Sequence, residues 1–186
     1  MRYVAGAVAT ADEPVTLADA KLHLRTITDT TEDVAIITPL ITAAREYCEN
    51  ITGRAIAKQT IKAYPDSFER IMRLPRPPIR SITAVKYTDE NGTTTTMDAS
   101  NYTLDGEYGR ILFHTIPSFA PRAINPIEIE YEAGYATAPK LIRQAILLLI
   151  GHWYTNREAV QTGAVTAVEI EITTRKLLRQ YREWWF

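Results

Sequence analysis

The spacing of apolar residues changes twice along the chain, and this constrains the fold more than any other feature. Before residue 58 and after residue 134, apolar residues recur every three or four positions, as they do in amphipathic helices. Residues 58–131 instead form short runs rich in β-branched and aromatic residues, separated by turn-forming residues. We therefore predict an α+β fold that is mainly α, in which a helical frame carries a small antiparallel β insertion.

These changes also predict the boundaries of the parts. We expect an extended N-terminal arm over residues 1–15 and N-terminal helices over residues 16–57. A β-rich insertion should follow over residues 58–134. The C-terminal helices of residues 135–186 should form one domain with the N-terminal helices.

Specific residues mark where the first helices begin and end. Thr16 and Asp19 have the spacing of a capping box, and that helix should end near Thr28. A second helix should begin after residues 29–32 and end at Gly53. Pro39 falls inside it and allows either a kink or a restart of the helix.

Seven β segments are expected, with a tight turn between two of them. Asn91-Gly92 tolerates positive φ and predicts a two-residue hairpin, whereas the proline-rich residues 75–78 predict a stiff extended connection. The expected strands are Gln59–Tyr64, Ile71–Leu74, Ser81–Tyr87, Thr93–Met97, Tyr102–Leu104, Arg110–Phe113 and Ile127–Tyr131.

The C-terminal part is expected to be helical on both sides of one extended segment. Residues 139–154 are apolar around most of a helix, which indicates burial in the subunit or against a neighbour. Residues 168–172 alternate acidic and apolar side chains and predict an extended segment. A short helix should follow from Thr173.

Composition and charge exclude several classes of protein. The chain has 21 basic and 22 acidic residues and a formal charge of −1, so it has no overall attraction for nucleic acid or for anionic membranes. Cys48 is the single cysteine, which excludes an intramolecular disulfide and fits a reducing compartment. No apolar run approaches the length of a membrane span, and we expect a soluble protein.

Residues that could support catalysis do not form a recognisable constellation. The three histidines are dispersed, and Cys48 has no nearby histidine to activate it. Glu128, Glu130 and Glu132 alternate along one strand and could serve a small metal-dependent hydrolase, but alternation alone produces a solvated acidic face of this kind. We predict no catalytic residue, no metal and no cofactor.

The C-terminal residues instead indicate an interaction surface. Aromatic side chains at the end of a helix too short to be stable alone are costly in water and require a partner. The arginines on the other side of this helix could touch DNA phosphates or a neighbouring subunit. The candidate assembly interface is Arg175, Arg179, Tyr181, Arg182, Trp184, Trp185 and Phe186, and Arg175, Arg179 and Arg182 are the candidate DNA-channel contacts.

Five blocks of sequence stand in a characteristic order along the chain. They are AAREYCENITGR with the following Gln59-Thr60, LPRPPIRSI at 74–82, VKYTDENG at 85–92 with NYTLD at 101–105, IEYEAGY at 129–135, and residues 139–158. Together these blocks resemble the head-tail connector proteins of long-tailed bacteriophages. The family's proline or glycine before the final Leu-Leu helix is missing from residues 165–172.

The resemblance implies a structural role without enzymatic activity. It implies a dodecameric ring beneath the portal that joins the portal to a downstream stopper or tail protein and lets double-stranded DNA pass without sequence specificity. The protein would lie in the virion neck, and in the host cytoplasm during assembly. The alternatives are another neck or tail-completion protein resembling a stopper, a DNA-binding adaptor, and the hydrolase considered above.

Overall fold

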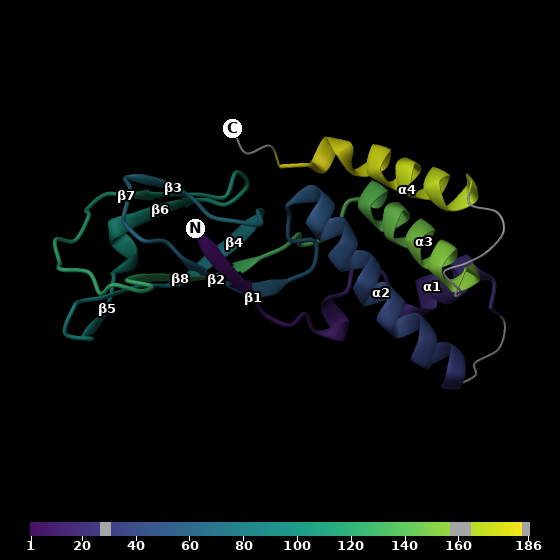
Figure 1. Ribbon diagram of the computed structural model, residues 1–186, viewed down its shortest axis with the longest axis horizontal. Helices are drawn as coiled ribbons and strands as arrows, with labels where there is room; N and C mark the ends of the chain where they lie inside the picture. Colours follow the sequence, from purple (N-terminus) through teal and green to yellow (C-terminus); the bar gives the residue numbers. More distant parts are fainter. Residues whose placement is uncertain (27–30, 157–164, 184–186) are drawn as a thin grey trace. The chain divides into compact units, whose positions relative to one another are not determined.

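The computed structural model describes the backbone of residues 1–26, 31–156 and 165–183 (Figure 1). Contacts between residues divide the chain into two compact units. One consists of residues 1–8 and 58–135 and holds all the described β-strands, and the other consists of residues 9–57 and 136–186 and holds the described α-helices.

The helical unit is built on three helices that lie side by side, α2, α3 and α4, with a shorter helix α1 against α2 and α3 (Figure 1). Their core is aliphatic, and it includes Ile37, Ile41 and Ala44 from α2 and Ile142, Ile146 and Ile150 from α3. Burial of these side chains is the main stabilising contribution in this unit. The helices are α1 (Leu17–Leu24), α2 (Thr31–Thr52), α3 (Lys140–Thr155) and α4 (Val165–Leu178), with 3-10 turns η1 (Thr10–Asp12) and η3 (Arg179–Tyr181).

The predicted capping box and helix stop are confirmed. The Thr16 hydroxyl accepts a hydrogen bond from the Asp19 amide, and the Asp19 carboxylate accepts one from the Thr16 amide. Gly53 follows α2 with a φ of 71°. Pro39 lies within a continuous α2. The first helix ends at Leu24 and not near Thr28, because Arg25 adopts the left-handed conformation that terminates it.

The prediction of an extended segment at residues 168–172 is wrong, because these residues belong to α4. Thr174 and Leu178, four positions apart on the same helix, are both fully buried. An alternation over five residues also places residues 168 and 172 one helical turn apart, so it cannot by itself distinguish a strand from a helix.

The β unit contains two antiparallel sheets. The first has the strand order β1-β2-β8-β4-β5, and the second has the order β3-β7-β6. The strands are β1 (Arg2–Ala5), β2 (Gln59–Tyr64), β3 (Ile71–Arg73), β4 (Ile79–Thr88), β5 (Thr94–Thr96), β6 (Tyr102–Asp105), β7 (Arg110–Phe113) and β8 (Ile127–Ala133), with a 3-10 turn η2 (Ala99–Asn101) before β6.

The predicted fold class, a mainly α helical frame with a small β insertion, is therefore wrong. The described part of the chain contains eight strands, which form two sheets, in addition to four α-helices. The β unit has a core of its own, with Ile61, Ile129 and Phe113 almost completely buried. The N-terminal residues add β1 to the edge of the first sheet, and β4 extends from Ile79 to Thr88. Exposed edge strands such as β1 lack the alternation of burial by which strands are recognised in a sequence.

The hairpin between β4 and β5 is wider than the predicted two-residue turn. The Gly92 amide donates to the Asp89 carbonyl oxygen at 3.0 Å, so Glu90 and Asn91 are the central residues of the turn. Only Gly92, with a φ of 84°, takes a positive φ in this loop. The Asp89 carboxylate stabilises the loop by accepting hydrogen bonds from the amides of Asn91 and Thr93.

Among the helices whose residues are described, none is long and apolar enough to cross a membrane.

Candidate assembly surface and basic ridge

A buried ionic network supports the end of α2. Arg45 pairs through Nη1 with Glu49 Oε2 at 2.8 Å and through Nε with Glu13 Oε2 at 3.0 Å. The other oxygen of Glu49, Oε1, accepts hydrogen bonds from the backbone amides of Ile56 and Ala57. Arg45 and Glu49 are 4% and 3% exposed, and buried charges of this kind are tolerated when each is paired and hydrogen-bonded. The network joins the N-terminal segment, α2 and the chain that follows α2.

Arg54 anchors the C-terminal segment to the same end of α2. Its Nε donates to the Tyr181 carbonyl oxygen at 2.8 Å, and its Nη2 donates to Glu183 Oε2 at 3.1 Å. The Glu183 amide donates to the Thr52 carbonyl oxygen at 2.8 Å, where the last turn of α2 leaves acceptors unsatisfied. Residues 181–183 are thus fixed in the helical unit. Arg45, Glu49 and Arg54 all lie in the first block that resembles connector proteins, and no role was predicted for them from the sequence.

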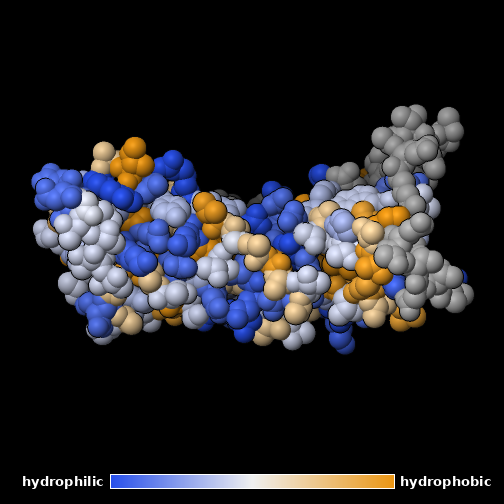
Figure 2. All heavy atoms as spheres, turned by 90° about the horizontal axis from the view of Figure 1, so that it is seen from below, coloured by the Kyte–Doolittle hydropathy of each residue, from blue (hydrophilic) through white to orange (hydrophobic). Residues whose placement is uncertain are grey.

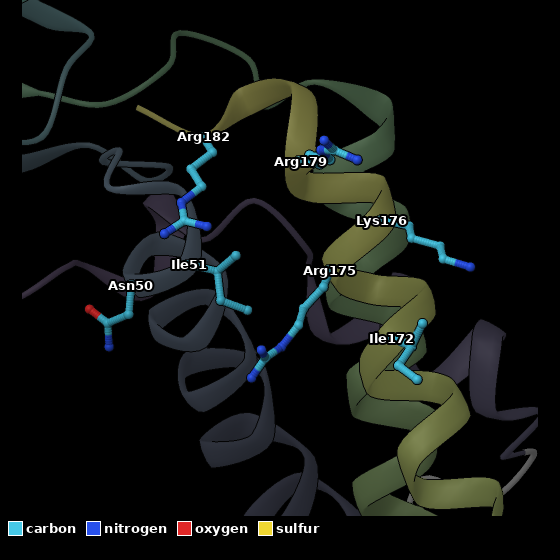
Figure 3. A pocket seen from close by; sticks show the side chains of 7 residues that line it. All are labelled: Asn50, Ile51, Ile172, Arg175, Lys176, Arg179 and Arg182. Carbon is cyan, nitrogen blue, oxygen red and sulfur yellow. The ribbon is translucent and has the colours of Figure 1, made fainter. Parts of the chain in front are cut away.

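Four cations lie along the exposed side of α4 and η3. Arg175, Lys176, Arg179 and Arg182 are all exposed, and we call this set the basic ridge. Figure 3 shows Arg175 and Arg182 pointing toward α2, whereas Lys176 points away from it. On the α2 side, the ridge borders a depression of about 440 Å³ whose other lining residues are Asn50, Ile51 and Ile172.

A second depression also borders the ridge. It is lined by Lys176, Arg179 and Gln180 together with Leu141 and Leu177. Ile172 is 45% exposed and lies among the cations. The end of α4 and the residues after it therefore present a cationic surface that borders two hollows.

The structure places the predicted interface residues on more than one side of the C-terminal segment. Arg175, Arg179 and Arg182 belong to the exposed ridge, whereas Tyr181 is half-buried. Trp184, Trp185 and Phe186 lie outside the described residues. Lys176 completes the ridge and was not predicted from the sequence, although its position between Arg175 and Arg179 could have indicated it.

The remaining exposed surface offers no single dominant apolar area on the face shown in Figure 2. Hydrophobic residues form small groups among hydrophilic ones there. A patch large enough to identify an interface by hydrophobicity alone would be continuous. On this face, charge is therefore a better guide to contacts than hydrophobicity.

The glutamates of β8 are paired with lysines. Lys62 Nζ lies 3.5 Å from Glu128 and 3.7 Å from Glu130, and Lys58 Nζ lies 3.3 Å from Glu132. The carboxylates of Glu128 and Glu130 raise the pKa of Lys62. These exposed pairs form a cross-strand charge ladder on one face of the sheet. Within the described ranges, no group of three histidine, cysteine or acidic residues could hold a metal ion.

The other candidate reactive groups are dispersed or inert. Burial raises the pKa of the Cys48 thiol to about 12, which keeps it protonated and unreactive at neutral pH. His114 is hydrogen-bonded to Thr103 at 2.8 Å, and His152 to Asn156 at 2.9 Å. These contacts are structural, and they lie in different units.

Comparison with known proteins gives one family and a set of similar structures. The model of a family described as "Head completion protein" matches residues 15–183. No curated protein matches the chain. Among solved structures, a chain in the neck of an empty gene transfer agent (GTA) particle, computed with C6 symmetry, is 23% identical, with a TM-score of 0.78. That match covers 100% of this chain and 97% of the other.

Two further structures have the same fold. A chain in the neck of the native GTA particle, computed with C12 symmetry, is 21% identical with a TM-score of 0.75, and one in the virion of the native GTA particle is 22% identical with a TM-score of 0.74. Each match covers 100% of this chain and 97% of the other. The likeness thus extends over both compact units.

Proposed function

The chain belongs to the head completion protein family, and from this premise we propose that it is a structural subunit of the virion neck that connects the head to the tail. The observation that carries the proposal is the likeness of the whole fold to chains of a virion neck, at a TM-score of 0.78. A partial likeness would support only a shared domain. Here the match covers the whole chain, so both compact units have an equivalent in the similar structure.

We propose that the protein acts as a ring of identical subunits, twelve in the virion. A ring requires head-to-tail contacts between two different surfaces of each subunit, because only such contacts close by rotation. The similar neck structures were computed with C6 and C12 symmetry, which supports a ring of this order. In this proposal the portal lies above the ring, a stopper or tail protein lies below it, and double-stranded DNA passes through it without sequence-specific contact.

The C-terminal segment is our candidate for protein contacts in the neck. Arg54 and Thr52 hold residues 181–183 in place, so the chain beyond Glu183 leaves from a fixed point. The aromatic residues Trp184, Trp185 and Phe186 follow directly. Aromatic side chains are favoured as anchors of protein interfaces because they bury a large area at a small entropic cost.

The protein has no catalytic role in this proposal and needs no cofactor. The thiol of Cys48 is protonated and buried, and the β8 carboxylates are paired with lysines. Burial of the thiol argues against a cysteine nucleophile, and the lysines beside the carboxylates offer a structural reason for the acidic row that needs no metal.

The direct test is electron microscopy of particles assembled with and without the protein. In its absence we expect DNA-filled heads that lack tails, and added purified protein should restore a ring with twelve-fold symmetry directly beneath the portal. If the added protein appears instead at a lower position in the neck, the protein is a stopper or tail-completion subunit. If tails attach normally in its absence, the proposed function is wrong.

A further inference from the structure

The basic ridge concentrates positive charge in a protein that is otherwise close to neutral. The whole chain has a formal charge of −1, yet four cations lie within residues 175–182. Among the described residues, Lys176 and Arg179 form no ion pair with a carboxylate, unlike Arg45, Arg54, Arg110 and Arg143. Such a concentration attracts a polyanion locally even when net charge does not.

The shape of the ridge favours an extended polyanion. With about 100° of rotation per residue, the four cations cover an arc of about 120° on the helix and extend about 10 to 12 Å along it. Side chains point to both flanks, as Figure 3 shows for Arg175 and Lys176. All four cations line the first depression, and two of them, Lys176 and Arg179, also line the second. A nucleic acid backbone lying along the helix can engage both flanks.

The spacing of charges on duplex DNA matches this length. Duplex DNA carries one negative charge for about every 1.7 Å of its axis, so the length of the ridge faces about six phosphates on the two strands. Arginine, which supplies three of the four cations, donates in a planar fork that suits phosphate oxygens. Contacts to phosphate oxygens carry no sequence information, so binding through them should be independent of sequence.

We infer that the basic ridge of Arg175, Lys176, Arg179 and Arg182 is a contact site for the phosphate backbone of the double-stranded DNA that passes through the neck. The inference rests on the proposed function, which brings DNA to the ring. It assigns the arginines of the C-terminal helix to DNA and leaves the aromatic end of the segment for protein contacts.

The test compares two variants of the full chain with equal charge. The ridge variant carries R175Q, K176Q, R179Q and R182Q. The control carries R70Q, R73Q, R80Q and K140Q, which neutralise four exposed cations elsewhere that form no ion pair in the described structure. Binding of a fluorescent 30-base-pair duplex of arbitrary sequence is measured by anisotropy between 50 and 200 mM NaCl, and circular dichroism checks that both variants are folded.

We expect the unmodified protein to bind the duplex with an affinity that falls about 100-fold over this salt range, as release of counterions from about four phosphates requires. The ridge variant should bind at least about tenfold more weakly at 50 mM NaCl, with a shallower salt dependence, and the control should bind within about twofold of the unmodified protein. The inference is wrong if the unmodified protein does not bind, if the ridge variant binds normally, or if both variants lose affinity equally.

Electron micrographs of the same proteins with portal-containing heads separate this test from that of the proposed function. Rings beneath the portal without DNA binding overturn the inference and leave the proposed function intact. DNA binding by a protein that never enters the neck overturns the proposed function. If the unmodified protein fails to bind DNA and the ridge variant fails to form rings, the ridge is a protein contact and the inference is wrong.

Discussion

Arg54 Nε donates a hydrogen bond to the carbonyl oxygen of Tyr181 at 2.8 Å, and this contact joins two residues 127 positions apart in sequence. The same guanidinium pairs with Glu183. The arginine follows Gly53, whose positive φ ends α2 and turns the chain. The Gly-Arg pair therefore has two functions in the fold, termination of a helix and attachment of the C-terminal segment.

Replacement of Arg54 by alanine should detach residues 179–183 without unfolding the helical unit. Charge-assisted hydrogen bonds contribute about 1.5 to 3 kcal/mol, and the partial exposure of this pair places the expected loss near the lower end. Hydrogen exchange of the Glu183 amide, which donates to the Thr52 carbonyl oxygen, should accelerate at least tenfold. Arg179→Ala, at an exposed position of the same segment, is the control. Equal exchange rates in Arg54→Ala and the unmodified protein would contradict the anchoring role.

Replacement of Glu49 by alanine should be among the most destabilising single changes in the helical unit. It removes one partner of a buried ion pair and the oxygen that accepts from the amides of Ile56 and Ala57, and breaking such a pair costs about 3 to 5 kcal/mol. Glu46 contacts the same arginine at 3.5 Å, but its side chain is 61% exposed. Glu46→Ala should therefore cost less than about 1 kcal/mol. Urea unfolding measures the free energy of unfolding of both variants. Similar losses in Glu49→Ala and Glu46→Ala would show that burial does not determine the cost of removing the carboxylate.

Gly92→Ala should destabilise the β unit, whereas Asn91→Ala should have little effect. A non-glycine residue at the φ of 84° found at Gly92 costs about 1 to 2 kcal/mol, while Asn91 has no positive φ. A Cβ added at Gly92 would meet no atom within 4 Å, so the cost is conformational and not steric. Thermal unfolding followed through the β-sheet signal provides the measurement. A larger loss for Asn91→Ala would indicate the two-residue turn that the sequence suggested.

The capping box of α1 should make stability depend on pH in the acid range. Hydrogen bonds from the Thr16 side chain and amide, and the nearby Arg143 guanidinium, lower the pKa of Asp19 below its usual value near 3.8. A carboxyl whose pKa is lower in the folded state stabilises the fold above its unfolded pKa and loses this contribution as pH falls through its folded pKa. Asp19→Asn should therefore reduce stability at pH 7 but much less at pH 2, as measured by urea unfolding. A loss that is independent of pH would contradict this.

Much of the local structure could be predicted from the sequence because it depends on short-range chemistry. The Thr16–Asp19 cap and the strand at Gln59–Tyr64 follow from spacing alone. The extent of the β unit could not be predicted in this way. The edge strand β1 is exposed throughout, so its burial carries no alternation that sequence periodicity could reveal, and it is stabilised by pairing with β2, which lies far along the chain.

The candidate site shows the same division between local and long-range information. Three cations of the ridge could be identified because helical spacing puts them on one side, and the fourth, Lys176, lies at the edge of the same arc. Arg45 and Glu49 have the i,i+4 spacing of a helical ion pair, but the further partners of Arg45 and Arg54, which are Glu13 and Tyr181, come from distant segments and were not predictable from spacing. Sequence resemblance marked these positions but gave no physical reason for them.

Two C-terminal truncations should separate folding from assembly. Removal of residues 184–186 keeps the contacts of Arg54 with Tyr181 and Glu183, so the shortened subunit should unfold at the same urea concentration as the full chain. It should nevertheless fail to enter the neck, because it lacks aromatic side chains whose burial in an interface is worth about 1.5 to 3 kcal/mol each before entropy is subtracted.

Removal of residues 179–186 also takes away both Arg54 partners and should lower stability as well. Urea unfolding and electron microscopy of heads mixed with each protein provide the two measurements. Normal rings from the protein lacking residues 184–186 would show that the aromatic end has no interface role, and unfolding of that protein would assign these residues to the core of their own subunit.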